Sequence, residues 1–165
     1  MELTHAAISK WFDLYFDEVR KNQGNLETVP KLKRYFTSDF EFMMYSAPAQ
    51  GTREPMSREA LLVSFVHPGL QEDIYPRHYA IDVSQMIAAV QFEIRFSDKP
   101  SGKEWPPIQA SAHYHLIADE NKDLKIRKIE YWTEALPGDL FEVWSERRAE
   151  ALTKHAVAYI NHNAV

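Results

Sequence analysis

Two histidines separated by one residue are the side chains best suited to chemistry in this sequence. His113 and His115 lie within an apolar run that predicts a β-strand, and side chains two apart on a strand project from the same face. A neutral imidazole, with a pKa of about 6.5, can accept and return a proton at physiological pH. Inside a pocket, the pair predicts general acid–base catalysis. In the alternative, the histidines face water or a second subunit, and the residues that alternate with them form the core: Ala110, Ala112, Tyr114 and Leu116.

Glu130, on the next predicted strand, is the best candidate acid. A carboxyl group in an apolar cavity has a raised pKa, which suits it to exchange a proton near neutral pH. If Lys128 and Glu130 instead form the exposed face of an edge strand, Glu130 is an ordinary surface residue. A metal site made of His78, His113 and His115 is a further alternative, although the sequence offers no ligand spacing beyond a single His-x-His.

The first part of the chain predicts helices around one strand. Aromatic and aliphatic side chains at helical spacing indicate an amphipathic helix over residues 5–21, with Thr4 as its cap. A shorter helical stripe follows over residues 26–36, and an aromatic-rich strand over residues 40–45. After a loop that contains proline and glycine, Ser57 caps another predicted helix.

The rest of the chain predicts strands and a final helix. Apolar runs cover residues 75–97, 108–118 and 124–135, and short polar connectors separate them, as in antiparallel hairpins. A helical stripe then covers residues 139–161. Helices followed by a meander of strands predict an α+β fold, with the helices packed on one face of a curved antiparallel sheet.

This order of elements, with the segment Leu124–Glu134 after a polar hairpin, resembles the NTF2-like superfamily. That superfamily includes SnoaL-like polyketide cyclases, ketosteroid isomerase, scytalone dehydratase and limonene epoxide hydrolase. The resemblance implies a cone-shaped domain over residues 1–138, in which N-terminal helices and a curved antiparallel sheet enclose an apolar pocket. Residues 139–165 then form a C-terminal helical extension of the same domain, similar to the last helix of scytalone dehydratase.

The resemblance also implies which side chains enter the pocket. Matching the hairpin at Asp119 to the last turn of the family places alternate residues of two strands inside: Ser111, His113, His115, Glu130 and Trp132. Scytalone dehydratase uses tyrosines and histidines, which the resemblance matches to Tyr45 and His78, with His113 in the space of its second histidine. Glu130 falls where the limonene epoxide hydrolases carry a catalytic aspartate. The predicted catalytic residues are therefore His113, His78, Glu130 and Tyr45. The predicted substrate-binding residues are Tyr15, Ser111, His115 and Trp132.

The sequence departs from two other members of the superfamily. The epoxide hydrolases need an arginine and an aspartate two apart on a long strand, where this chain has Gln91–Glu93. The two catalytic acids of the ketosteroid isomerases are replaced by Met44 or Tyr45 and by Ser111. The resemblance therefore favours neither of these two reactions.

Composition limits the classes of partner. The 165-residue chain has no cysteine, which excludes disulfides, thiolate nucleophiles and cysteine-ligated metals. Its net charge of −5 disfavours nucleic acid as a partner. No apolar run reaches the roughly 18 residues of a membrane helix, and the N-terminus lacks a secretion signal, so we expect a soluble, cytoplasmic protein that does not bind membranes.

Together these patterns predict an acid–base enzyme that needs neither a cofactor nor a metal. Its predicted reaction is the dehydration, cyclisation or isomerisation of a small, apolar, oxygenated molecule such as a polyketide or terpenoid. One alternative is a non-catalytic protein that binds a small ligand in the same pocket, and another is a partner-binding module like the transport factors. The resemblance implies a homodimer formed through the outer face of the sheet.

Overall fold

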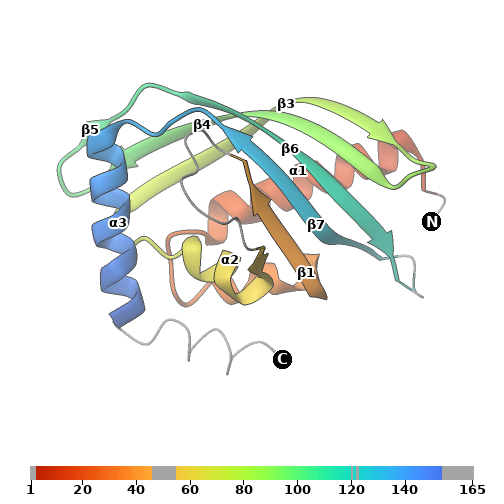
Figure 1. Ribbon diagram of the computed structural model, residues 1–165, viewed down its shortest axis with the longest axis horizontal. Helices are drawn as coiled ribbons and strands as arrows, with labels where there is room; N and C mark the ends of the chain where they lie inside the picture. The colour runs from red at the N-terminus through yellow and green to blue at the C-terminus, as the bar shows by residue number, and fades with distance from the viewer. Residues whose placement is uncertain (1–2, 46–54, 120, 122, 154–165) are drawn as a thin grey trace.

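In the computed structural model, a curved sheet wraps around helices on its concave face (Figure 1). The structure describes residues 3–45, 55–119, 121 and 123–153. The α+β fold predicted from the sequence, with helices packed on one face of a curved sheet, is confirmed. Most of the predicted proline- and glycine-containing loop, and the last part of the predicted final helix, lie outside the described residues.

Two α-helices begin at the expected caps. Thr4 precedes α1 (His5–Asn22) and Ser57 precedes α2 (Arg58–Ser64). In each case the hydroxyl oxygen accepts a hydrogen bond of 3.2 Å from a backbone N–H of the first turn. These bonds satisfy N–H groups that have no partner inside the helix.

The other helices differ in type and position. Residues Val29–Tyr35 form η1, a 3₁₀ helix with Pro30 at its start, where the missing N–H of proline breaks no hydrogen bond. The final helix, α3 (Gly138–Thr153), stands at one end of the curved sheet (Figure 1). No helix in the described residues combines the length and the apolarity needed to cross a membrane.

The described residues contain a seven-stranded sheet. Its strands are β1 (Phe36–Met44), β2 (Met56–Ser57), β3 (Leu70–Asp82), β4 (Ile87–Asp98), β5 (Lys103–Glu104), β6 (Ile108–Ala118) and β7 (Leu124–Thr133). The order is β2-β1-β7-β6-β4-β3, and β5 pairs with β4. The pairings β4–β6 and β6–β7 are antiparallel, as predicted. The run predicted as one strand over residues 75–97 instead folds back into the antiparallel hairpin β3–β4, and β1 pairs with β7 in parallel. The local turn patterns carry no information about this pairing, because it joins distant parts of the chain.

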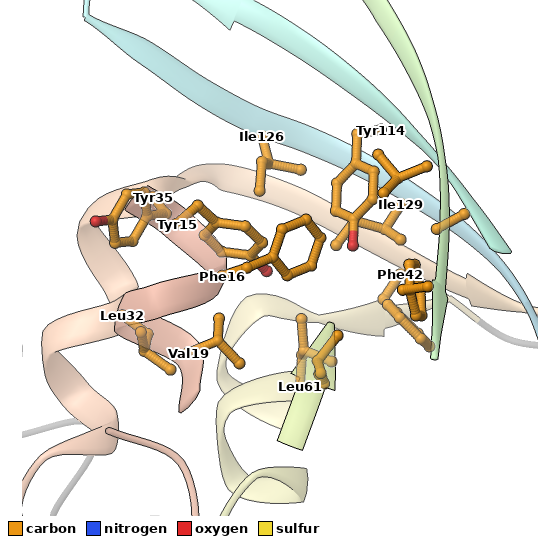
Figure 2. Close-up of a cluster of buried hydrophobic side chains, with 14 of the residues drawn as sticks. Tyr15, Phe16, Val19, Leu32, Tyr35, Phe42, Leu61, Tyr114, Ile126 and Ile129 are labelled. Atoms are coloured by element: carbon orange, nitrogen blue, oxygen red, sulfur yellow. The ribbon is translucent and has the colours of Figure 1, made fainter. Parts of the chain in front are cut away.

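Alternate residues of the sheet build the core. On β6 the buried side chains are Ala110, Ala112, Tyr114 and Leu116. The aromatic stripe of α1 packs against them, with the Phe12 and Tyr114 ring centroids 5.0 Å apart. Figure 2 shows this layer, in which side chains of α1 and α2 lie beneath Tyr114, Ile126 and Ile129 of the sheet.

Candidate functional site

The concave side of the sheet holds an apolar cavity of about 690 Å³. Every helix except η1 and every long strand of the sheet contributes to its wall, and most of the lining side chains are aromatic or aliphatic. Part of that wall is visible in Figure 2, where Phe16 and Val19 of α1 lie near Tyr114 and Ile129 of the sheet. A cavity of this size can accommodate a small organic molecule.

Glu72 of β3 places a carboxylate in this apolar wall. Its Oε2 lies 3.2 Å from Nε2 of His67, a fully buried side chain in the turn between α2 and β3. The other ring nitrogen of His67, Nδ1, lies 2.8 Å from the carbonyl oxygen of Leu70. Gly24, whose φ of 77° favours glycine, also lies beside the His67 imidazole.

These two contacts determine how many protons the pair holds. A carbonyl oxygen only accepts hydrogen bonds, so Nδ1 of His67 carries a proton. A hydrogen bond between Nε2 and the Glu72 carboxyl then requires one further proton, carried either by the imidazole or by the carboxyl group. Glu72 and His67 therefore form a buried pair that shares one proton beside an apolar cavity.

The pKa of His67 is raised above its ordinary value. Burial alone opposes the charged imidazolium, but the hydrogen bond to Glu72 and the charge of that carboxylate outweigh it. The shift favours the state in which His67 carries the shared proton and Glu72 is ionised. An ionised carboxylate held in this way can act as a base toward a molecule in the cavity.

Three tyrosines supply hydroxyl groups to the cavity wall: Tyr15, Tyr114 and Tyr131. Burial raises the pKa of each well above its usual value, and the nearby charge of Glu72 adds to the effect at Tyr131. The phenols therefore stay protonated and can donate hydrogen bonds at any physiological pH. The Tyr15 and Tyr114 ring centroids lie 6.2 Å apart, so the two hydroxyls belong to one region of the wall.

Glu72 also borders a second, smaller recess of about 240 Å³. The lining of this recess is polar and includes Gln23, Gln71 and Lys99. Glu72 thus borders both an apolar cavity and a polar recess. This arrangement offers a route by which the shared proton exchanges with solvent.

The predicted orientation of β6 is wrong. Tyr114 lines the cavity, whereas His113 is exposed and Ser111 and His115 are partly exposed on the opposite, convex face. The apolar residues that alternate with the histidines form the core, because their burial removes more apolar surface from water than burial of the polar set. The alternative prediction, in which the histidines lie outside the core and the residues that alternate with them form it, is therefore the observed arrangement.

The predicted orientation of β7 is wrong for a different reason. Leu124 and Ile126 are buried, and uninterrupted alternation would place Glu130 and Trp132 on the same side. A bulge interrupts the pairing of β6 and β7 between Ile126 and Lys128. One extra residue reverses the faces, so Ile129, Tyr131 and Thr133 line the cavity while Glu130 and Trp132 face outward.

Several predicted residues nevertheless lie together on the convex face. Nε2 of His115 is 3.0 Å from Oε2 of Glu130, and Nζ of Lys128 donates to Oε1 of Glu130 over 2.9 Å. The hydrogen bonds from His115 and Lys128 lower the pKa of Glu130, although an apolar pocket was expected to raise it. Glu130 is therefore a partly exposed, ion-paired carboxylate.

Aromatic contacts extend this group along the convex face. Trp132 stacks on Tyr45 with centroids 5.1 Å apart and meets His113 edge-on at 4.9 Å. His78 is exposed on β3, and neither it nor Tyr45 lines the cavity, which corrects their predicted place in the pocket. Among the predicted site residues, Tyr15 does line the cavity. Within the described ranges, no three His, Asp or Glu side chains are grouped so as to hold a metal ion.

Sequence reasoning missed Glu72, His67, Tyr114 and Tyr131 as site residues. A signal for Glu72 is present, because it alternates with Leu70 and Ile74, which are both buried. An acid between two inward-facing apolar residues of a strand points to a cavity or a buried pair. The signal was lost because the strand was predicted to begin at residue 75.

Comparison with known proteins shows similarity in structure alone. No protein-family model and no curated protein sequence matches the chain. ActVI-ORFA of Streptomyces coelicolor is 14% identical, with a TM-score of 0.57 over 78% of this chain and 96% of that one. Nuclear transport factor 2 of Cryptosporidium parvum is 12% identical, with a TM-score of 0.56 over 76% and 90% of the two chains. A ketosteroid isomerase-like protein of Erwinia carotovora atroseptica is 13% identical, with a TM-score of 0.54 over 80% and 96%.

At such low identity, structural similarity establishes the fold and leaves the activity open. The neighbours share the curved sheet and the helices packed inside it. The chain has the NTF2-like fold, as its sequence resemblance implied.

Proposed function

We propose that the chain is an acid–base enzyme that isomerises or dehydrates a small, apolar, oxygenated molecule, with Glu72 as the proton carrier. The observation that carries the proposal is the 3.2 Å contact between Glu72, in the wall of an apolar cavity, and the fully buried His67. A buried acid–base pair beside a cavity, in which the pKa of the histidine is raised, is typical of enzyme sites. The fold neighbours support a small-molecule site without selecting a reaction, since one is named a ketosteroid isomerase-like protein and another a transport factor.

In the proposed step, the ionised Glu72 removes a proton from a carbon next to a substrate carbonyl. The electron pair of the broken C–H bond moves toward the carbonyl oxygen, which becomes an enolate oxygen. A tyrosine hydroxyl of the wall, from Tyr15, Tyr114 or Tyr131, donates a hydrogen bond to that oxygen. Return of the proton to another carbon gives an isomer, and loss of a neighbouring hydroxyl as water gives a dehydrated product. Neither outcome requires a cofactor.

His67 acts through Glu72 in this scheme. Its imidazolium stabilises the carboxylate before the proton is taken, and its buried, doubly hydrogen-bonded ring keeps Oε2 of Glu72 in place. The apolar wall excludes water on the cavity side of the carboxylate, so the interaction with developing charge is stronger there than in solution. The polar recess behind Glu72 allows the proton to be exchanged between turnovers.

Deuterium exchange tests the proposal without knowledge of the natural substrate. A panel of apolar ketones is incubated with the protein in deuterated buffer, and deuterium at the carbon next to the carbonyl is measured by mass spectrometry. We expect exchange with at least one ketone, and a loss of about 100-fold or more in Glu72→Gln, since general bases contribute about that factor.

Glu130→Gln is the matched control, because it changes the ion-paired carboxylate of the convex face. It should leave the exchange rate unchanged. If Glu72→Gln keeps full exchange, or if both variants lose it equally, the role of Glu72 is refuted. Binding of ketones without any exchange would favour the non-catalytic ligand-binding alternative.

A further inference from the structure

An arginine from the last helix enters the wall of the same cavity. Arg148 of α3 lines the cavity, and its guanidinium carbon lies 5.0 Å from the ring centroid of Trp144, which also lines it. The stacking contact holds the guanidinium group against the wall. Arg148 is the only lysine or arginine among the described lining residues.

The charge of Arg148 is not balanced by the described part of the protein. Its Nε atom is buried without a hydrogen-bond partner, and no ion pair joins Arg148 to a carboxylate among the described residues. Burial lowers the pKa of Arg148, and no neighbouring acid opposes that effect. A guanidinium group remains charged even so, and a partly desolvated charge favours a counter-ion.

The two carboxylates of the lining are already engaged elsewhere. Glu72 is paired with His67, and Glu134 accepts a hydrogen bond of 3.0 Å from the backbone N–H of Gln109. Neither lies close enough to Arg148 to form an ion pair. As far as the described residues show, the cavity therefore combines a large apolar surface with one unpaired cation in its wall.

We propose that the ligand of this cavity is an apolar carboxylic acid whose carboxylate binds Arg148 while its apolar body fills the space between the sheet and α1. The planar guanidinium can donate two parallel hydrogen bonds to a carboxylate. This inference rests on the proposed function only in using the same cavity. If both hold, Arg148 anchors one end of the substrate and Glu72 acts on a carbon further along it.

Binding of a matched acid and alcohol tests the inference. The probes are decanoate and 1-decanol, and each is measured by displacement of the neutral fluorophore N-phenyl-1-naphthylamine at neutral pH. The wild-type protein should bind decanoate more tightly than decanol by about tenfold, the usual gain from hydrogen bonds between charged groups. Arg148→Met should remove this preference and leave decanol binding within about twofold of wild type.

Arg147→Met is the matched control on the same helix. Arg147 pairs with Asp98 at 3.3 Å and does not line the cavity, so its loss should preserve the preference for decanoate. Arg148→Lys keeps the charge without the planar pair of donors and should retain part of the preference. Thermal unfolding of each variant shows whether α3 remains folded. The preference of the wild type for decanoate is measured without any substitution, so it tests the inference even if a variant does not fold.

The outcomes separate this inference from the proposed function. Equal binding of decanoate and decanol by the wild type, or a preference that survives Arg148→Met, overturns the role of Arg148 and leaves the exchange chemistry of Glu72 untouched. Arg148-dependent decanoate binding without any deuterium exchange supports the inference and rejects the enzyme. Failure of both ligands and of the fluorophore to bind overturns the inference together with the proposed ligand site.

Discussion

Replacing Glu72 by glutamine should reverse the effect of His67 on the pH dependence of the free energy of unfolding. In the wild type, the folded-state pKa of His67 is raised above its unfolded value of about 6.5. A raised pKa means that the imidazolium stabilises the fold fully below about pH 6.5, and that this contribution is lost as pH rises through the folded-state pKa. Each unit of difference between the folded and unfolded pKa corresponds to about 1.4 kcal/mol.

In Glu72→Gln the carboxylate charge is gone, and burial of the fully enclosed imidazole remains the dominant effect. The folded-state pKa of His67 should then fall below its unfolded value, so the variant loses stability as pH falls through about 6.5. Near pH 8 the glutamine amide can donate to the neutral imidazole, and the cost relative to wild type should be about 1 kcal/mol. Near pH 5.5 the cost should rise to about 3 kcal/mol, because the unfolded variant takes up a proton that its folded state excludes, while the folded wild type still stabilises the imidazolium.

Urea unfolding of both proteins at several pH values above about 5.5, where most carboxylates remain ionised, measures the effect. Glu130→Gln is the control, because its partner His115 is partly exposed and its ion pairs should contribute less than about 1 kcal/mol. The reasoning fails if Glu72→Gln destabilises the protein by the same amount at both ends of this pH range.

Two further predictions concern the cavity wall and the turn behind His67. Tyr114→Phe removes a hydroxyl without opening a cavity, so the free energy of unfolding should change by less than about 1 kcal/mol. If this hydroxyl binds the substrate oxygen, the rate of deuterium exchange should fall about tenfold or more. An unchanged exchange rate would exclude Tyr114 as the donor. Gly24→Ala should cost about 1–2 kcal/mol in urea unfolding, since its φ of 77° is unfavourable for alanine. No loss of stability would mean that the turn adopts another conformation.

The parts of the fold that depend on local chemistry could be predicted from the sequence. Thr4 and Ser57 cap helices because their hydroxyls satisfy nearby N–H groups, and these bonds involve only residues close in the chain. The aromatic stripe of α1 follows helical spacing, so its buried face was also predictable. The parallel pairing of β1 with β7 was not, because it joins segments separated by most of the chain.

The site could not be predicted because it depends on strand faces. A bulge of one residue near Arg127 reverses the direction of every later side chain on β7, and nothing in the local composition marks it. The pairing of His67 with Glu72 depends on a turn that folds back beside β3. The two side chains can be recognised as partners only once the path of the backbone is known. Polar residues whose chemistry suits catalysis, such as His113, were therefore predicted as site residues instead of the residues that face the cavity.

The most direct test of the central claim is an NMR titration of the His67 imidazole in the wild type and in Glu72→Gln. If Glu72 and His67 share a proton beside the cavity, the wild-type imidazole titrates above its ordinary pKa of about 6.5 and the variant titrates below it. A His67 pKa that is the same in both proteins would show that the two side chains do not share a proton, and would remove the basis of the proposed chemistry.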